Sequence, residues 1–307
     1  MLTAAGGVLV SYAAPDVSVA LTNPALLNPL LHAQVNLTFT QVVAGINGYS
    51  LAGAVHDKKS STTFGAGVFF LNYGQLQATD AAGNQEGTFR ANDYVLQVSA
   101  GRHYLQKWHY GATLKFIQSS YQVFRSTALA ADVGLYYTDT AKGVSIGVVA
   151  KNMGSQVKKY AGEPEELPFD LQAGITKKLA KAPLAFSATI QQAHRFNLLY
   201  HDTTFNNETN AEAQTSFSNK LLQHFVFASH IFISKQLELT LGYNHLRRTD
   251  LSIGTTSNGL AGFSAGFAAR FEKLQVSYAR TSYQRGASYN QFGLNLLFDK
   301  LFGAGTF

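Results

Sequence analysis

The side chains that could do chemistry are few in this sequence and scattered along it. It contains nine histidines, eighteen carboxylates and no cysteine, so disulfides and thiolate metal sites are excluded. No two histidines combine with a carboxylate at the spacing of a metal site on one helix or strand. The nine histidines are His32, His56, His103, His109, His194, His201, His224, His230 and His245. Most of them fall near the ends of predicted strands, where a ring with one polar edge suits the membrane interface better than a metal site.

Carboxylates gather at one place, the run Glu163-Pro164-Glu165-Glu166. This run falls in a predicted loop, so we interpret it as an unconstrained acidic loop and not as a cation site. A hydrolase needs an activated serine or an acid with a base in reach, and His201-Asp202 alone in a long loop is too little to indicate one. We therefore predict that the protein is not an enzyme and has no cofactor and no metal.

Alternating polarity is the main structural signal. From Leu237 to Tyr243 every second residue is leucine or tyrosine, and the pattern returns after Gly262 and continues to Asp299. A period of two predicts strands with one apolar and one polar face. The runs are about a dozen residues long, and a tilted strand crosses a membrane with ~9–11 residues.

Fourteen such stretches follow residue 31. Their predicted ranges are 32–42, 46–56, 62–73, 87–105, 107–124, 126–140, 142–152, 167–180, 182–195, 223–235, 236–248, 259–272, 273–285 and 287–299. Every second connection is tight, whereas the intervening ones include long members at 74–86, 153–166, 196–222 and 249–258. Short turns at one rim and long loops at the other are typical of bacterial outer-membrane barrels, with the short turns in the periplasm. The sequence thus predicts an all-β fold, a fourteen-stranded antiparallel transmembrane β-barrel over residues 32–307.

The composition agrees with a barrel whose outer wall lies in lipid. Hydrophobic residues make up 46% of the chain and charged residues only 14%, against about 25% in typical soluble domains. No apolar run approaches the ~18 residues of a spanning helix. The net charge is +6, but the lysines sit mainly in connections and not in a patch interleaved with aromatic residues, which argues against nucleic-acid binding.

Residues 1–31 do not alternate and are predicted to form a plug or hatch segment. Asp16 is placed to cap a short helix, which Asn23 and Pro24 end. The first seven residues lack the basic segment, apolar core and cleavage site of a secretory signal peptide, which indicates a processed or truncated start.

Two charges interrupt the apolar alternation inside strands. Lys115 and Arg270 each stand between two apolar residues. A charge turned to lipid at mid-height costs about 2–4 kcal/mol. Both are therefore predicted to face the lumen, where they either pair with other charges or line a route.

Several motifs resemble a known family. Asn23-Pro24-Ala25-Leu26-Leu27, following Gly6-Gly7 and the acidic turn at Asp16, resembles the N-terminal region of the fourteen-stranded barrels related to the FadL fatty-acid transporters, and within them the PorV/PorQ group of the Bacteroidota type IX secretion system. The runs Leu-Thr-Leu-Gly-Tyr-Asn at 239–244, Gly-Phe-Ser-Ala-Gly-Phe at 262–267 and Val-Ser-Tyr-Ala-Arg at 276–280 are similar to PorQ-like members. The resemblance covers almost the whole chain, but the family's signal peptide and the short segment before the double glycine are missing.

The resemblance implies a non-enzymatic component of type IX secretion in the outer membrane of a Gram-negative bacterium. Such barrels are held to anchor a surface attachment complex through their extracellular loops. The implied partners are outer-membrane lipid, a PorZ-like surface protein, PorV and the sortase-like PorU. The resemblance carries over no individual binding residue.

Candidate contact residues follow from residue type alone. Aromatic and apolar loop side chains make better anchors than isolated charges. In the long loops these are Tyr160, Phe205, Asn206, Phe217 and Leu221, each of which could equally pack within its own loop. The alternative function is that of a FadL-like transporter of hydrophobic small molecules, because the two functions share one fold.

Overall fold

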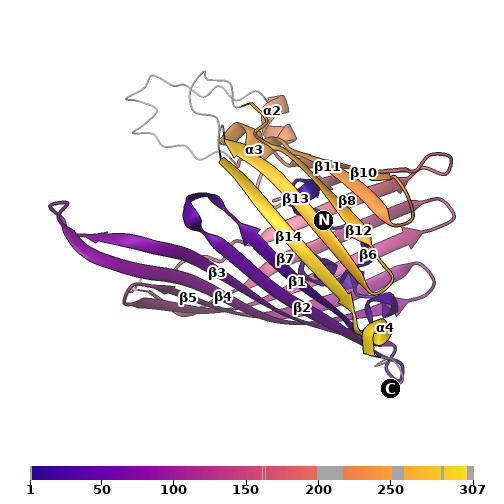
Figure 1. The fold of residues 1–307 in the computed structure, drawn as a ribbon, viewed down its shortest axis with the longest axis horizontal. Helices are drawn as coiled ribbons and strands as arrows, with labels where there is room; N and C mark the ends of the chain where they lie inside the picture. Colours follow the sequence, from indigo (N-terminus) through magenta and orange to yellow (C-terminus); the bar gives the residue numbers. More distant parts are fainter. Residues whose placement is uncertain are drawn as a thin grey trace.

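A computed structural model describes residues 2–160, 162, 164–198, 217–250, 259–284 and 287–302. Its strands form one closed barrel in which each strand pairs antiparallel with its neighbours in the chain and β1 closes onto β14 (Figure 1). The strands are β1 (Gln34–Gln41), β2 (Asn47–Asp57), β3 (Thr62–Thr79), β4 (Gln85–Tyr104), β5 (Trp108–Tyr121), β6 (Phe124–Asp139), β7 (Val144–Lys158), β8 (Asp170–Lys178), β9 (Leu184–Ile190), β10 (Phe225–Phe232), β11 (Leu237–Asn244), β12 (Phe263–Arg270), β13 (Leu274–Gln284) and β14 (Ala287–Leu297). The predicted fold class is confirmed, and each predicted range overlaps one strand in order.

Among the described residues, three short α-helices accompany the strands. They are α2 (Phe217–Leu222), α3 (His245–Asp250) and α4 (Phe298–Phe302). The helix α3 directly follows β11 on the side of the long loops, and α4 directly follows β14 on the side of the short turns. Within the part of the chain that the structure describes, none of the helices has the length and apolar character to cross a membrane.

The connections differ between the two rims. Those predicted to be tight contain three to five residues. The long loop predicted at 74–86 is wrong, because β3 continues to Thr79 and β4 begins at Gln85. Asp80 makes the tight turn between them possible, since its carboxylate accepts hydrogen bonds from the backbone N–H of Ala82 at 2.9 Å and of Asn84 at 2.8 Å.

The strands β3 and β4 extend beyond their other neighbours. Pairing between β2 and β3 stops at Asn72, and pairing between β4 and β5 starts at Ala91. Residues 75–90 therefore form a two-stranded hairpin that projects past the rim, at the left of Figure 1. We call this hairpin the ribbon.

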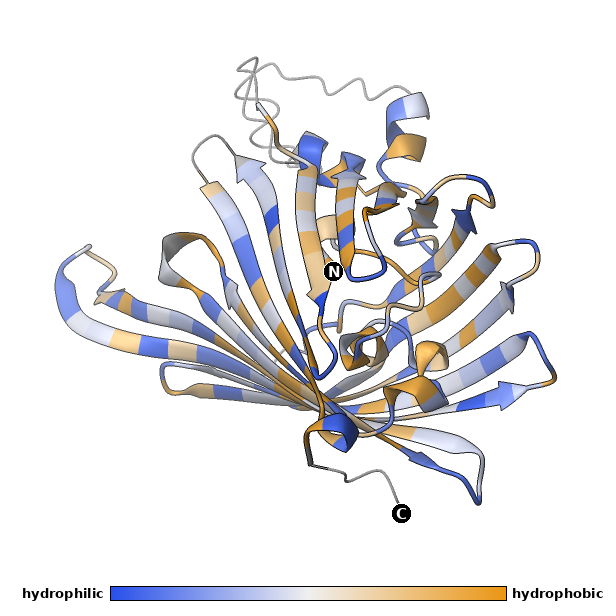
Figure 2. Cartoon of the chain, turned by 45° about the vertical axis from the view of Figure 1, so that its right-hand side comes forward, coloured by the Kyte–Doolittle hydropathy of each residue, from blue (hydrophilic) through white to orange (hydrophobic). Residues whose placement is uncertain are grey.

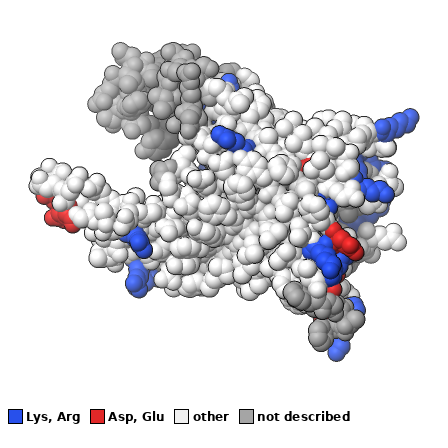
Figure 3. Space-filling model, viewed as in Figure 1, with Lys and Arg blue, Asp and Glu red and all other residues white. Residues whose placement is uncertain are grey.

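The outer wall of the barrel is apolar. Leu51, Val68, Leu96 and Leu114 are 39–64% exposed on this face, and apolar residues recur along the strands in Figure 2. Charged residues gather toward the two ends of the molecule and are sparse between them on the face seen in Figure 3. Hydrocarbon requires such an uncharged wall. The barrel therefore spans a membrane.

An unbroken row of aromatic residues crosses this wall. One aromatic residue on each of seven neighbouring strands is the register partner of the next: Phe267, Tyr278, Phe292, Phe39, Tyr49, Phe70 and Tyr94. Ring centroids lie as close as 4.7 Å, between Phe70 and Tyr94. Cross-strand aromatic pairs contribute about 0.5–1.5 kcal/mol beyond area burial. Phe39 and Phe292 are register partners on the two strands that close the barrel, so the row continues across the closing seam.

The N-terminal segment, residues 2–31, lies inside the barrel. It contains four short 3-10 helices, η1 (Thr3–Ala5), η2 (Val17–Leu21), η3 (Pro24–Leu26) and η4 (Pro29–Leu31). The apolar side chains of Ala5, Val10, Leu26 and Leu31 are at most 2% exposed. The helix η3 packs against β4, β5 and β6, whereas η1 packs against β11, β12 and β13. The segment therefore connects opposite parts of the wall.

Polar side chains set the path of this segment. Asp16 accepts a hydrogen bond from the backbone N–H of Ser18 at 2.9 Å and begins η2. Asn23 accepts from Ala25 N at 3.0 Å and begins η3, in which Pro24 is the first residue. The helix expected after Asp16 is thus a 3-10 helix, and the Asn23-Pro24 pair that ends it begins the next one.

Glycines in the wall make room for the segment. Gly101, Gly111 and Gly134 are register partners on β4, β5 and β6. A β-carbon at Gly111 would lie 2.5 Å from the carbonyl of Pro24, and one at Gly101 would lie 2.6 Å from the β-carbon of Leu27. Real β-carbons do not approach so closely. Only glycine therefore lets the segment rest directly on this part of the wall.

Replacing Gly111 by alanine is expected to lower the free energy of unfolding by about 1–3 kcal/mol, because the added methyl must push the backbone of η3 away. Unfolding by guanidinium in lipid vesicles, followed through the single tryptophan, Trp108, measures this. The control is Gly48→Ala, where the nearest atoms to the new methyl lie 3.5 Å away. Equal stability of the two variants would contradict the close seating of the segment.

Candidate functional site

The N-terminal segment divides the space inside the barrel. On the side of the short turns a cavity of about 400 Å³ lies between the segment and the wall. Tyr12 and Pro15 of the segment line it, together with Lys178 and Arg270 of the wall. A molecule that crosses the barrel must therefore pass or displace the segment.

The first charged group in the lumen is the Lys115 cluster, formed by Lys115, Asp132 and Asn152. The ammonium of Lys115 lies 2.6 Å from Asp132 Oδ2 and donates to Asn152 Oδ1 at 2.9 Å. The backbone N–H of Asn152 donates to Asp132 Oδ1 at 2.8 Å. The side chains of Lys115 and Asp132 are only 8% and 3% exposed. Lys115 is thus paired within the wall and does not present a free charge to a solute.

A β-bulge places Asn152 in this cluster. Asp132 on β6 stands opposite two residues of β7, Lys151 and Asn152, between the pairs Ala131–Met153 and Val133–Ala150. Asn152 has a φ of +58°, a left-handed conformation that asparagine adopts more easily than most residues. Its side chain also donates to the carbonyl of Pro168 at 2.9 Å. The bulge therefore joins the charge pair to the start of β8.

The second group is the Glu238 cluster, formed by Tyr12, His230, Glu238 and Arg270. Arg270 Nη2 lies 2.5 Å from Glu238 Oε2, and the hydroxyl of Tyr12 donates to Glu238 Oε1 at 2.8 Å. The ring of Tyr12 stacks on His230 with centroids 4.1 Å apart. Burial and the neighbouring carboxylate raise the pKa of Tyr12 well above its usual value, so its hydroxyl keeps the proton that it donates. The cluster thus joins the N-terminal segment to β10, β11 and β12.

A further contact extends this connection. Arg270 Nε donates to Gln275 Oε1 at 3.1 Å, and Gln275 Nε2 donates to Asp16 Oδ2 at 3.4 Å. Asp16 therefore both caps η2 and contacts the wall. Arg270, predicted to face the lumen, lies at its edge with 27% of its side chain exposed.

An apolar area of the inner wall lies on the loop side of the segment. Val68 and Phe69 are consecutive and both 39% exposed, so they face opposite sides of the wall. Phe69 shares its face with Gly65 and Gly67, which contact Leu27 and Leu21 of the segment. Leu71 follows on the same face. Val95 on β4 is the register partner of Phe69, and Ile117 on β5 is the register partner of Val95. We call Phe69, Leu71, Val95 and Ile117 the inner apolar patch.

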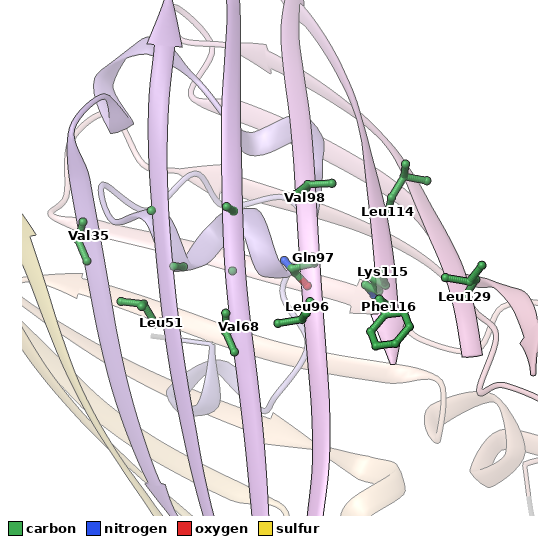
Figure 4. Close-up of a pocket in the computed structure, with 14 residues that line it drawn as sticks. Val35, Leu51, Val68, Leu96, Gln97, Val98, Leu114, Lys115, Phe116 and Leu129 are labelled. Carbon is green, nitrogen blue, oxygen red and sulfur yellow. The ribbon is translucent and has the colours of Figure 1, made fainter. Parts of the chain in front are cut away.

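A second apolar hollow lies on the outside of the wall. Its volume is about 580 Å³, and Figure 4 shows Val35, Leu51, Val68, Leu96, Leu114 and Leu129 on neighbouring strands around it. Gly53 and Gly67 contribute small residues to its lining. These leucines and valines belong to the membrane-facing side, so the hollow opens toward the lipid.

The structure describes three of the five loop residues predicted to contact partners. Phe217 and Leu221 lie on α2 and are 67% and 43% exposed, and the ring of Phe217 is 5.8 Å from that of Phe196 in the same loop. Tyr160 is half-buried after β7. Phe205 and Asn206 lie outside the described residues.

The histidines correct one expectation. His230 is not at an interface but fully buried in the middle of β10, with Nδ1 3.2 Å from Glu238 Oε1 and Nε2 3.3 Å from Ser187 Oγ. Sequence spacing gave no signal of this, because the residues come from three strands. The hydroxyl of Ser187 also bonds to Thr176 at 2.8 Å. Tyr12 covers the histidine, so no substrate reaches this serine while the segment is in place.

Two Gly-x-Ser-x-Gly runs occur in the chain, at 143–147 on the side of the short turns and at 262–266 on the side of the long loops. Both begin strands, β7 and β12, and neither stands at the strand-to-helix turn that exposes a nucleophilic serine. Ser264 donates to the carbonyl of Ala4 at 3.0 Å and so binds the N-terminal segment. Among the described residues, no three side chains of histidine, aspartate or glutamate are grouped to hold a metal.

No protein-family model and no curated protein matches the sequence. Solved structures do resemble the chain. A mutant of the monoaromatic hydrocarbon channel TodX called deltaS2 aligns with 14% identity and a TM-score of 0.56 over 94% of this chain and 95% of that one. The P. putida toluene transporter TodX aligns with 12% identity and a TM-score of 0.53 over 96% and 95%. At such low identity the likeness shows a common barrel fold.

Proposed function

We propose that the protein is an outer-membrane barrel of a Gram-negative bacterium through which small hydrophobic molecules enter the envelope. The inner apolar patch carries this proposal, because an exposed phenylalanine among apolar neighbours on the lumen side of the wall favours an apolar ligand. The fold supports it, since the similar solved structures are of a monoaromatic hydrocarbon channel and a toluene transporter. The pairing of Lys115 and Arg270 with carboxylates also agrees with an uncharged cargo.

The N-terminal segment would control this passage. Phe69 lies two residues beyond Gly67, which contacts Leu21 of the segment, so a molecule on the patch rests next to the segment. The cavity of about 400 Å³ on the other side would receive it. Movement of the segment requires its contacts with Glu238 to break or rearrange.

Replacing Phe69 by glutamate is expected to lower protein-dependent entry of an apolar fluorophore, phenylnaphthylamine, about tenfold, because a carboxylate in the patch must be desolvated by the passing molecule. The measurement is the rise of fluorescence in intact Gram-negative cells that produce the protein. The control, Gln75→Glu, adds the same charge on the exposed ribbon and leaves entry unchanged. If the fluorophore enters at the normal rate with Phe69→Glu, the patch is not part of the route. If the fluorophore does not enter with the wild type, the transport proposal itself is wrong.

A second function is supported by the ribbon and by the resemblance to the PorV/PorQ group. We propose that the loop side anchors a surface complex of type IX secretion, with a PorZ-like protein, PorV and PorU as partners. The supporting observation is that β3 and β4 continue well past the end of their pairing with β2 and β5. A wall that only encloses a channel does not need this extension. Anchoring and transport are separable, because one uses the outside of the rim and the other the lumen.

A further inference from the structure

The ribbon has two edges that the barrel does not use. Along β3, backbone pairing with β2 has stopped at Asn72, and among the described residues none pairs with the outer edge of residues 75–79. Along β4, residues 85–90 precede the first pair with β5. Each edge presents backbone N–H and C=O groups that are free to pair with another strand.

The two edges differ in chemistry. Residues 85–90 include Glu86, Arg90 and Gly87, whose φ of +113° breaks the regular strand. Charges and irregular backbone at an edge are the usual means of preventing strand addition. Residues 75–79 read Gln-Leu-Gln-Ala-Thr and contain no charge, proline or glycine. Only the β4 edge of the ribbon therefore carries such protection.

Another free edge near the rim, at the end of β7, is covered. The end of β7, residues 153–158, lies beyond its last pair with β8. There the side chain of Gln156 accepts a hydrogen bond at 2.8 Å from the backbone N–H of Glu165 in the following loop, and Lys158 adds a charge. Compared with it, the β3 edge of the ribbon between Gln75 and Thr79 has no backbone partner on its outer side among the described residues and carries no charge.

We propose that an extended segment of another protein binds the β3 edge of the ribbon as an added strand, opposite residues 75–79. Backbone hydrogen bonds would supply the affinity, as in other cases of strand addition. Leu76 and Ala78 are half-buried, whereas Gln75, Gln77 and Thr79 are exposed. The partner segment would thus alternate apolar side chains beside Leu76 with uncharged polar ones beside the glutamines.

A second copy of this chain does not fit the edge. In a symmetric dimer, residue i of one copy contacts residue j of the other, and residue j of the first contacts residue i of the second. Two identical strand edges that pair in this way must run antiparallel. Two copies in one membrane point their ribbons the same way, so their β3 edges run in the same direction. The occupant is therefore a different polypeptide on the loop side. This inference rests on the second proposed function, the anchoring of a surface partner.

The absence of native cysteine allows a direct test. Gln75→Cys, Gln77→Cys and Thr79→Cys are each labelled with a photoreactive maleimide in cells of the native host, irradiated, and the cross-linked peptides are sequenced by mass spectrometry. We expect the labels at all three positions to cross-link to one stretch of one protein. Successive labels should mark residues two apart, in one direction along that stretch. Thr88→Cys on the opposite edge should give about tenfold less product. A variant with alanine at positions 75, 77 and 79 should keep capture within about twofold, because the backbone is what binds.

Each contrary result has its own meaning. If the tagged wild type recovers a surface partner but the three sites mark unrelated positions, anchoring stands and strand addition is wrong. If the triple alanine variant loses the partner, side chains and not the edge recognise it. Cross-links to a second copy of this chain also contradict the proposal. If the wild type recovers no surface protein, both anchoring and strand addition fail.

Discussion

Replacing Asp132 by alanine is expected to lower the free energy of unfolding by about 3–5 kcal/mol, the cost of leaving a buried charge without its partner. The side chain of Lys115 is 8% exposed and has its ammonium 2.6 Å from Asp132. The carboxylate also accepts the backbone N–H of Asn152, which would lose its acceptor. Lys151 also stands opposite Asp132 at the same bulge.

A double variant separates the charge from the packing. Lys115→Met combined with Asp132→Ala removes both charges and keeps most of the side-chain volume, and we expect it to recover most of the lost stability. Guanidinium unfolding in lipid vesicles, followed by the fluorescence of Trp108, measures the free energy of unfolding of the wild type, of Asp132→Ala and of the double variant. If the double variant is as unstable as Asp132→Ala, the loss comes from the bulge at Asn152 and not from an unpaired lysine.

Lys115 also shows how far the sequence alone can predict this molecule. Its position between apolar neighbours in an alternating strand predicts that it faces the lumen, because the two faces of a strand are fixed by a period of two. The identity of its partner was not predictable. Asp132 is opposite Thr113 and not opposite Lys115, so the pair is diagonal and depends on the register between β5 and β6. Register is a property of the closed barrel, which no single strand contains.

The same limit applies to the ribbon and the N-terminal segment. Residues 74–86 contain two glycines, an aspartate and an asparagine, which indicated a loop, yet β3 and β4 continue because they pair with each other. Gly101, Gly111 and Gly134 look like ordinary bends in the sequence. Their common role appears only when the segment lies against all three. Local composition predicted the strands, whereas contacts between distant parts of the chain decide what the lumen contains.

Glu238→Ala is expected to lower the free energy of unfolding by a similar amount, about 3–5 kcal/mol, and also to release the N-terminal segment. Glu238 is 1% exposed and accepts from Arg270 on β12 and from Tyr12 on the segment, so its loss breaks contacts within the wall and between wall and segment together. The segment contains no lysine or arginine, so chymotrypsin, which cleaves after Tyr12, is the suitable probe of its release.

Two control variants decide which contact matters. Tyr12→Phe removes only the hydroxyl that binds Glu238, whereas Arg270→Gln removes the cation on the wall and its hydrogen bond to Gln275, and leaves the bond from Gln275 to Asp16 of the segment available. If the cluster fixes the segment, Tyr12→Phe should speed cleavage several-fold with a loss of only about 1 kcal/mol in unfolding, while Arg270→Gln should lower stability with little change in cleavage below the unfolding transition. If Tyr12→Phe leaves cleavage unchanged, the close contacts at Gly101, Gly111 and Gly134 hold the segment in place, and Glu238 does not. Movement of the segment would then require the wall itself to widen, because the contact at Gly111 leaves no room for the backbone to slide.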